Sequence, residues 1–197
     1  CSGPAEAPPE ETAPVFREDP VWVTEEEAGS AELLAGPADP GRLLELAHRA
    51  AGLGADKPLS LEALLASPRP RELEQLSYTF AVSGLTLAGV THLVRHRMQS
   101  VIVPPIQSVD HSRFILPDTI RNDPAALAIY QNALTEANRA AKALCEDPAL
   151  RPYSCYYAVS GNMLDVMTTL NARELMLIVR LRTCTRAQWE IRHVAMG

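Results

Sequence analysis

An Arg95-His96-Arg97 run directly after a largely apolar stretch over residues 85–94 limits the possible structures more than any other feature of the chain. We predict a buried helix over residues 85–97 that ends with this run. Successive residues of a helix lie about 100° apart, so three side chains at its end fan out to different faces and suit a site with two anionic groups. Buried cations without partners are costly, so an anion is expected nearby. The run is also typical of a solvated helix end that complements the helix dipole.

The composition of the 197 residues is that of an acidic globular protein, with 47% hydrophobic residues and a net charge of −6. We expect residues 1–20, rich in Pro, Ala and Glu, to form a disordered or loosely attached arm, and residues 21–197 to form one domain. The negative charge argues against a nucleic-acid binder, and no apolar run reaches the about 20 residues that span a membrane. The four cysteines form no CxxC pair and have no histidine at ligand spacing, so we expect no metal site and a cytoplasmic protein.

Hydrophobic periodicity predicts the remaining elements. Helices are predicted over residues 41–51, 60–66, 124–146, 172–182 and 185–194, with Ser60, Asp123 and Asn171 at N-terminal positions typical of caps. Strands are predicted over residues 21–23, 73–82 and 166–170. Pro104-Pro105 excludes a helix, so residues 98–113 are expected to be a loop with extended segments. Residues 156–165 fit a short helix or coil.

Two stretches together resemble the flavin-dependent thymidylate synthase family. The first is Arg95-His96-Arg97 after its apolar stretch. The second is more specific, and comprises Asn171-Ala172-Arg173-Glu174-Leu175, Arg180-Leu181-Arg182 and residues 186–192. Glu74 and the predicted strand residues Tyr78-Thr79-Phe80 also stand where the family has its Glu-His…Thr-Phe strand. The resemblance spans roughly residues 40–196.

The resemblance implies an α+β fold of the flavin-dependent thymidylate synthase type, with helices packed on a mostly antiparallel sheet. It also implies a homotetramer whose active sites are each built from several subunits. The implied reaction is reductive methylation at C5 of a uracil nucleotide, UMP and/or dUMP. FAD and NADPH are the implied cofactors, and methylene-tetrahydrofolate is the implied one-carbon donor.

The resemblance also assigns residues to roles. The implied cofactor-binding residues are Glu74, His96, Arg97, Asn171 and Arg173. The implied substrate-binding residues are His92, Arg95, Ser100, Gln107 and Arg182, of which Arg182 is also the catalytic residue that polarises the pyrimidine ring. Structural alternatives remain open: Asn171 as a helix cap, Arg182 in an ion pair with Glu190, and His92 as an ordinary helix histidine.

These residue types suit the implied chemistry. Arginine pairs with phosphate oxygens in a bidentate manner that lysine cannot match. Uracil C5 becomes nucleophilic only when negative charge develops on the ring carbonyls, and a fixed cation beside the ring stabilises that charge. A flavin supplies the redox chemistry, so no side-chain nucleophile is needed.

The sequence departs from the family pattern at the residues that normally hold the nucleotide phosphate. Pro105 and Gln107 stand where the pattern has Ser and Arg, and Cys155 stands at another phosphate-binding Arg. Ser108, Ser112 or Arg113 are candidates to substitute for them.

The flavin half of the pattern is thus kept and the phosphate half is rewritten. We therefore expect a specialised member that methylates a different uridylate, comparable to the UMP methylases of peptidyl-nucleoside antibiotic pathways such as polyoxin. One alternative is a non-catalytic relative that keeps a flavin or nucleotide in a structural or regulatory role. Another is a helical interaction protein, which would leave the match over residues 171–192 unexplained.

Overall fold

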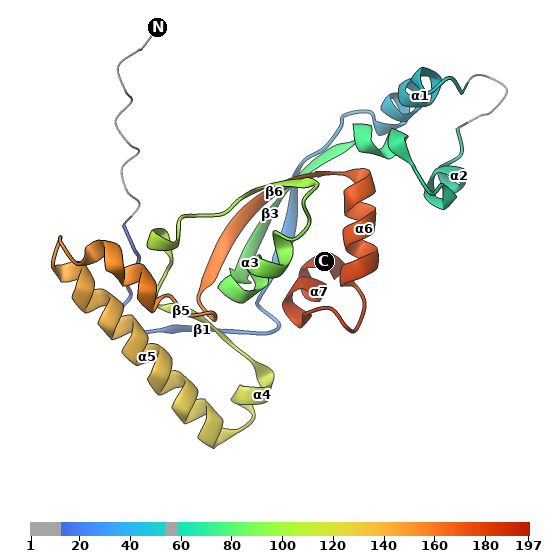
Figure 1. Cartoon of the computed structure of the whole chain (residues 1–197). Coiled ribbons are helices and arrows are strands. Elements are labelled where there is room, and N and C mark those ends of the chain that lie inside the picture. The colour runs from blue at the N-terminus through green and yellow to red at the C-terminus, as the bar shows by residue number, and fades with distance from the viewer. Residues whose placement is uncertain (1–12, 54–58) are drawn as a thin grey trace, which may run out of the picture.

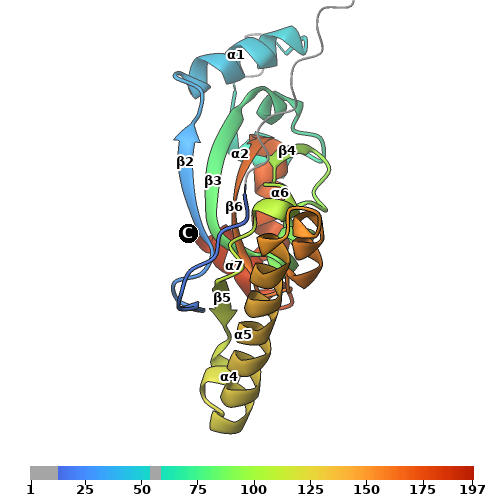
Figure 2. The ribbon, with the colours of Figure 1, turned by 90° about the vertical axis from the view of Figure 1, so that its left-hand side faces the viewer.

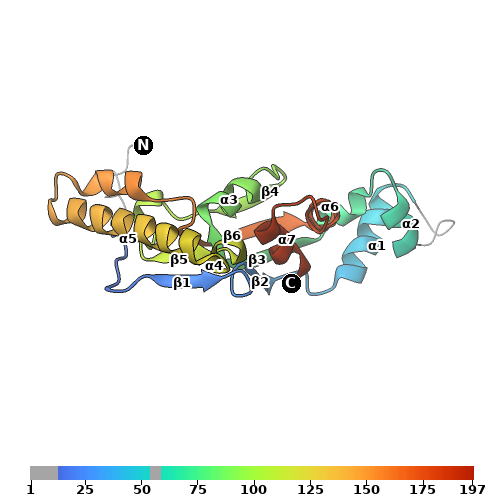
Figure 3. The ribbon, with the colours of Figure 1, turned by 90° about the horizontal axis from the view of Figure 1, so that it is seen from below.

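The computed structural model describes residues 13–53 and 59–197. The molecule is elongated, with a sheet in the middle, helices α1 and α2 at one end and helix α5 at the other (Figures 1 and 3). The strands are β1 Val21–Thr24, β2 Ser30–Ala35, β3 Ser77–Thr86, β4 Gln99–Ile102, β5 Arg113–Leu116 and β6 Met163–Asn171. The α-helices are α1 Pro40–Ala50, α2 Leu61–Ala66, α3 Leu87–Leu93, α4 Asp118–Arg121, α5 Pro124–Glu146, α6 Ala172–Arg182 and α7 Trp189–Met196. The 3₁₀ helices are η1 Arg71–Gln75, η2 Ile106–Ser108 and η3 Arg151–Tyr157.

The central sheet has the strand order β2-β3-β6-β4, and all of its neighbouring strands are antiparallel. Figure 2 shows β2, β3 and β6 running side by side between α1 and α5. Strands β1 and β5 form a separate parallel pair. This arrangement of helices and a mostly antiparallel sheet confirms the predicted α+β fold class.

The main core lies on one face of the central sheet. Val82 pairs with Val166 across β3 and β6, so their side chains share a face. Both are buried together with Val90 and Leu93 of α3 and Ile191 of α7. The core therefore joins the sheet to α3, which precedes the Arg-His-Arg run, and to α7, which contains the end of the C-terminal motif.

The strand predicted over residues 73–82 is shifted in the structure. Residues 71–75 form η1, because its 3₁₀ repeat of three residues places Leu73 and Leu76 on one side, where both are buried beside Leu64. Strand β3 then continues to Thr86. Gly84, at φ 67°, lies in a bulge and does not end the strand, and its N–H donates to Asp165 Oδ1 at 2.7 Å.

The helix predicted over residues 85–97 is also much shorter than expected. Helix α3 begins after Thr86, whose Oγ1 accepts a hydrogen bond from the Gly89 N–H at 2.9 Å. It ends at Leu93, whose carbonyl accepts a hydrogen bond from Gln99 Nε2 at 2.6 Å. The Arg95-His96-Arg97 run therefore lies in the turn between α3 and β4. The prediction that these three side chains fan out from the end of a helix was wrong.

The other element predictions are mostly confirmed. Helices α1, α2, α5 and α6 match their predicted ranges within one residue, and Ser60, Asp123 and Asn171 accept N-cap hydrogen bonds. Residues 151–157 are helical and β6 is longer than predicted. Helix α7 starts four residues later than predicted, because Gln188 Oε1 caps it through the Ile191 N–H. Strand β2 falls in an acidic segment broken by glycine, and was not predicted. In the described part of the chain, no helix has the length and hydropathy needed to cross a bilayer.

The first described residues of the chain, around Phe16 and Arg17, contact residues 110–112. Phe16 stacks on His111 with ring centroids 5.1 Å apart, and Arg17 Nε lies 3.1 Å from Asp110 Oδ2. Residues 1–12 of the predicted arm lie outside the described residues, whereas residues 13–17 make these specific contacts. His111 is buried, and its Nε2 has no hydrogen-bond partner among the described residues. Burial lowers the pKa of His111 below its ordinary value, despite the opposing charge of Asp110.

This buried histidine predicts an acid-dependent loss of stability. A neutral His111 stabilises the folded state above its unfolded pKa of about 6.5, and that contribution is lost as the pH falls toward the lowered folded pKa. The free energy of unfolding, measured by denaturant titration between pH 7.5 and 5, should fall by up to about 1.4 kcal/mol per pH unit from this group. His111→Phe should keep the ring stack and flatten the dependence. The half-buried His193, changed to Gln, is the control; an unchanged profile in His111→Phe would contradict the assignment.

Candidate functional site

Helix α6 and its N-cap carry three of the predicted site residues, Asn171, Arg173 and Arg182, and place the two arginines on different faces. It begins at Asn171, whose Oδ1 accepts a hydrogen bond from the Glu174 N–H at 2.9 Å. The capping role of Asn171 is thus confirmed, and its amide nitrogen is left for other partners. Because β6 runs directly into α6, the helix start is fixed to the centre of the sheet.

One face of α6 lines a cavity of about 510 Å³. Arg173, Met176, Leu177 and Arg180 recur at i, i+3, i+4 and i+7 and form this wall. The other lining residues come from the end of α2, the Pro-rich turn, η1 and the turn before β4: Leu65, Ser67, Pro68, Pro70, Glu74 and Met98, with Asn171 and Glu174 at the helix start. Arg173 Nη1 makes an ion pair with Glu74 Oε1. The predicted cofactor residues Glu74, Asn171 and Arg173 are therefore brought together in one cavity.

Glu174, at the edge of the cavity, and Arg182, on another face of α6, join the helix to the Arg-His-Arg run through a chain of side chains. His96 Nδ1 lies 3.2 Å from Glu174 Oε1, and Arg182 Nε donates to His96 Nε2 at 2.9 Å. Since an arginine can only donate, His96 Nε2 must accept, and the ring proton lies on Nδ1 facing the Glu174 carboxylate. His96 and Glu174 are both buried. The chain fixes one edge of the Arg182 guanidinium and leaves its two terminal nitrogens without a hydrogen bond to the described residues.

The structure separates the other predicted site residues from this chain and cavity. Arg95 and Arg97 are exposed on either side of His96, and neither forms an ion pair with a residue in the described ranges. His92 is half-buried in the last turn of α3, and Ser100 is exposed on β4 opposite Thr169. Gln107 is exposed in η2, which packs against η3 near the α5 end of the molecule (Figure 1). Within one chain, Gln107 is therefore remote from the cavity at the α2 end.

Glu190 does not bind Arg182, so that alternative was wrong. Its buried carboxylate accepts hydrogen bonds from the N–H and, at 2.7 Å, the hydroxyl of Thr86 at the start of α3. A Cβ at Gly89 would lie 2.5 Å from Glu190 Oε1, so α3 approaches α7 this closely only with glycine there. Glu190 thus fixes the helix that leads into the Arg-His-Arg run.

Two residues of the site were not given roles by sequence reasoning. Glu174 and Arg180 both stand within the matched motif, but the motif shows neither which helix face they occupy nor what they contact. Helical spacing carries the missing signal. Arg173 and Arg180, seven residues apart, share a face of α6, whereas Glu174 and Arg182, eight residues apart, lie about 80° from each other around the helix and both contact His96.

The residue types that line the cavity at α6 suit a flavin dinucleotide. The N-terminal end of α6 and the Arg180 side chain favour negative charge, while Met176 and Leu177 offer an apolar surface between Arg180 and the Arg173–Glu74 pair. No group of three or more His, Cys, Asp or Glu side chains within residues 13–53 and 59–197 is placed to hold a metal ion.

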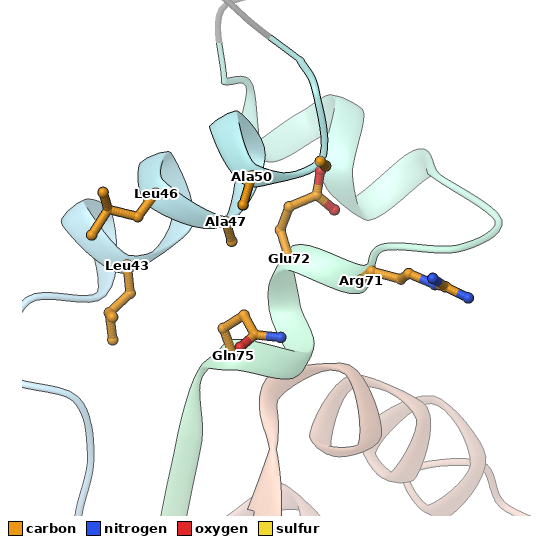
Figure 4. Close-up of a pocket in the computed structure, with 8 residues that line it drawn as sticks. Leu43, Leu46, Ala47, Ala50, Arg71, Glu72 and Gln75 are labelled. Carbon is orange, nitrogen blue, oxygen red and sulfur yellow. The ribbon is translucent and has the colours of Figure 1, made fainter.

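A second cavity, of about 420 Å³, lies between α1 and η1 and has a different character (Figure 4). Its walls are largely apolar, with Leu43, Leu46 and Ala47 on one side. Glu72 on the other side pairs with His48, Nδ1 to Oε1 at 3.3 Å. None of the predicted site residues lines this cavity, so the candidate site remains the one at α6.

Comparison with known proteins identifies the same family. The family model described as thymidylate synthase complementing protein matches residues 42–197. The flavin-dependent thymidylate synthase of Nitratidesulfovibrio vulgaris is 32% identical over 145 residues, which cover 68% of this chain and 59% of the relative. The chain spans about 60% of the length of the curated relatives it matches.

Solved structures show the same fold at low sequence identity. A UMP/dUMP methylase from Streptomyces cacaoi, bound with 5-Br UMP, has a TM-score of 0.72 and 21% identity over 92% of this chain and 88% of its own. Thymidylate synthase X from Helicobacter pylori, with FAD and dUMP, has a TM-score of 0.58 and 15% identity over 85% of this chain and 90% of its own. The match over residues 42–197 decides the assignment: the chain belongs to the Thy1 family, that of the flavin-dependent thymidylate synthases.

Proposed function

We propose that the chain catalyses flavin-dependent reductive methylation at C5 of a uracil nucleotide. The observation that carries the proposal is the contact between His96 and Arg182, at 2.9 Å. It links the two motifs of the family through two residues that lie 86 positions apart in the sequence, which supports one site built from both. The relatives' names support the activity: the N. vulgaris relative is a flavin-dependent thymidylate synthase, and the S. cacaoi neighbour is a UMP/dUMP methylase.

Arg182 is the proposed catalytic residue. Its Nε is committed to His96, so the two terminal nitrogens can donate to a carbonyl oxygen of the pyrimidine ring. Negative charge that develops on this carbonyl makes C5 a nucleophile, and a positioned guanidinium stabilises that charge. Since His96 is buried and tied to Glu174, the cation is oriented before substrate arrives.

The proposed cofactor set is FAD with NADPH, and methylene-tetrahydrofolate is the proposed one-carbon donor. FAD, when bound, supplies the redox chemistry that passes reducing equivalents from NADPH to the transferred carbon. In the balanced reaction, C5 loses a proton and gains the methylene carbon, a hydride from NADPH reduces that carbon to methyl, and the folate nitrogens take up the C5 proton and one proton from solvent, so that tetrahydrofolate and NADP⁺ leave. Glu74, Asn171 and Arg173 would hold the flavin beside the helix start, with His96 and Arg97 at the adjoining turn.

A homotetramer with shared sites is part of the proposal, and it accounts for the residues that lie apart in one chain. Gln107 lies beside η3, far from the cavity at α6. A neighbouring subunit that presents Gln107 would bring it to the nucleotide, together with His92, Arg95 and Ser100 at the α3–β4 side. The assembly would act in the cytoplasm.

We propose UMP, with dUMP as a second substrate, because the rewritten phosphate positions Pro105 and Cys155 indicate a specialised member and the S. cacaoi neighbour is a UMP/dUMP methylase. That preference would fit a nucleoside-antibiotic pathway. The alternative function is a non-catalytic relative that holds a flavin or nucleotide. Its supporting observation is that Pro105 and Gln107 stand where the family pattern has Ser and Arg.

The direct test is an assay of purified protein with FAD, NADPH and methylene-tetrahydrofolate, offered UMP and dUMP separately, with products detected by mass. We expect a mass increase of one methyl group on UMP, and a smaller yield from dUMP. Product from dUMP alone would overturn the proposal that the chain is a specialised UMP methylase. Bound flavin without any product would favour the non-catalytic relative, and absence of flavin binding would remove both.

Substitution of Arg182 tests its role. Arg182→Gln removes the cation, so kcat should fall by about 100-fold or more while the stoichiometry of bound FAD stays the same. Arg182→Lys should rescue little, since an ammonium cannot donate to His96 and face the ring at the same time. Exposed Arg139 on α5, changed to Gln, is the control. A fall in kcat below threefold in Arg182→Gln would count against a catalytic role.

Substitution of Glu174 tests the buried chain. Glu174→Gln keeps an oxygen for the His96 Nδ1–H, whereas Glu174→Ala leaves this donor buried without a partner, at a cost of about 1–3 kcal/mol of stability. Nitrogen NMR of the His96 ring should show the Nδ1–H tautomer in all three proteins, because Arg182 keeps Nε2 an acceptor, and the Nδ1–H of Glu174→Ala should exchange faster with solvent. The exposed Glu136→Gln on α5 is the matched control. Unchanged stability and unchanged Nδ1–H exchange in Glu174→Ala would contradict the contact.

A further inference from the structure

Arg180 lines the cavity at α6 without a partner. Its side chain is exposed, and within the described ranges it forms neither a hydrogen bond nor an ion pair. Arg173, the other arginine of the same wall, is paired with Glu74. The positive charge of Arg173 is thus offset by a carboxylate, whereas that of Arg180 is not.

The spacing of these two arginines sets the length of a ligand that could reach both. Seven residues of α-helix place Arg173 and Arg180 on the same face, with their Cα atoms about 10 Å apart along the axis. Met176 and Leu177 lie between them on the cavity wall. The wall therefore presents, in order, the Arg173–Glu74 pair, an apolar surface and the unpaired Arg180 cation.

The outer end of this wall needs Arg180 in order to accept an anion. The N–H groups at the N-terminal end of α6 attract negative charge without help from a side chain. The carbonyl groups of the last turn repel an anion. Arg180 and Arg182 both stand in that last turn, but Arg180 lines the cavity whereas Arg182 donates to His96, so the Arg180 guanidinium is the group that could attract an anion at this end of the wall. Guanidinium groups bind phosphate oxygens in a bidentate manner.

We propose that Arg180 binds a phosphate group of an elongated ligand that lies along the Met176–Leu177 surface. With the proposed function, on which this assignment rests, the ligand is the flavin dinucleotide and the group belongs to its diphosphate. Arg180 is then an affinity and selectivity residue: it distinguishes phosphorylated flavins from riboflavin. It takes no part in the chemistry at the pyrimidine.

The test compares three flavins on the full chain freed of bound flavin. Dissociation constants for FAD, FMN and riboflavin are measured by fluorescence titration for wild type, Arg180→Gln and Arg180→Lys. Arg180→Gln should weaken FAD about tenfold, as expected for one charge-assisted contact, and leave riboflavin unchanged. Arg180→Lys should recover part of the loss. The FAD affinity of Arg180→Gln should also depend less on salt than that of the wild type.

Arg139→Gln on α5 controls for the change in net charge, since α5 lies at the opposite end of the molecule from α2 (Figure 1). Equal losses for riboflavin and FAD, or no loss for either, would overturn the proposal while leaving the proposed function intact. If the wild type binds no flavin, the proposed function loses its cofactor. Arg180 is then judged by calorimetry with inorganic pyrophosphate: binding that Arg180→Gln abolishes supports the anion site, and no binding by the wild type overturns it.

Discussion

The hydrogen-bonded chain from Glu174 through His96 to Arg182 is the contact on which the rest of the site depends. It holds the turn after α3 against α6, although 78 residues separate His96 from Glu174. A buried carboxylate and imidazole are stable together only because each satisfies the other. Because this contact fixes the orientation of α6, two faces of the helix have different roles. One face holds Arg182 in a fixed orientation, and the other forms a wall of the cavity that contains the Glu74–Arg173 pair.

The sheet supplies the frame for this contact. Strand β6 leads directly into α6, and β3 leads directly into α3, so both helices start from neighbouring antiparallel strands but at opposite ends of them. Glu190 adds a second tie, from α7 to the first turn of α3 through Thr86. With both ends of α3 fixed, the turn that carries Arg95, His96 and Arg97 has little freedom, and the buried histidine between two exposed arginines follows from that geometry.

Much of this arrangement could be predicted from the sequence, and the failures have physical causes. Helices α1, α2, α5 and α6 were predicted within one residue, because caps such as Asn171 and Asp123 are local signals. The family was predicted from the motif over residues 171–192. The length of α3 was not predicted correctly. The hydrogen bond from Gln99 to the carbonyl of Leu93 marks the end of the helix, and this contact cannot be read from the apolar periodicity of residues 85–94. Strand β2 was missed for a similar reason, since it exists through pairing with β3 and not through its own residues. The partners of Glu174 and Glu190 needed the tertiary fold.

The elongated shape divides the apolar interior into separate clusters, and this has a consequence for how a ligand enters. Leu64, Leu73 and Leu76 form a small cluster at the α2 end, distinct from the larger cluster beneath α3 and α7. Small clusters open at lower free energy than large ones, and amide hydrogen exchange would register this as faster exchange around α2 and η1. The side of the cavity formed by Leu65 and Pro70 adjoins this smaller cluster, against which Met176 of α6 also packs, whereas the start of α6 continues directly from β6 of the central sheet. Local opening of the smaller cluster would therefore widen the cavity on the α2 side and give a ligand an entrance, while β6 keeps the start of α6 in place.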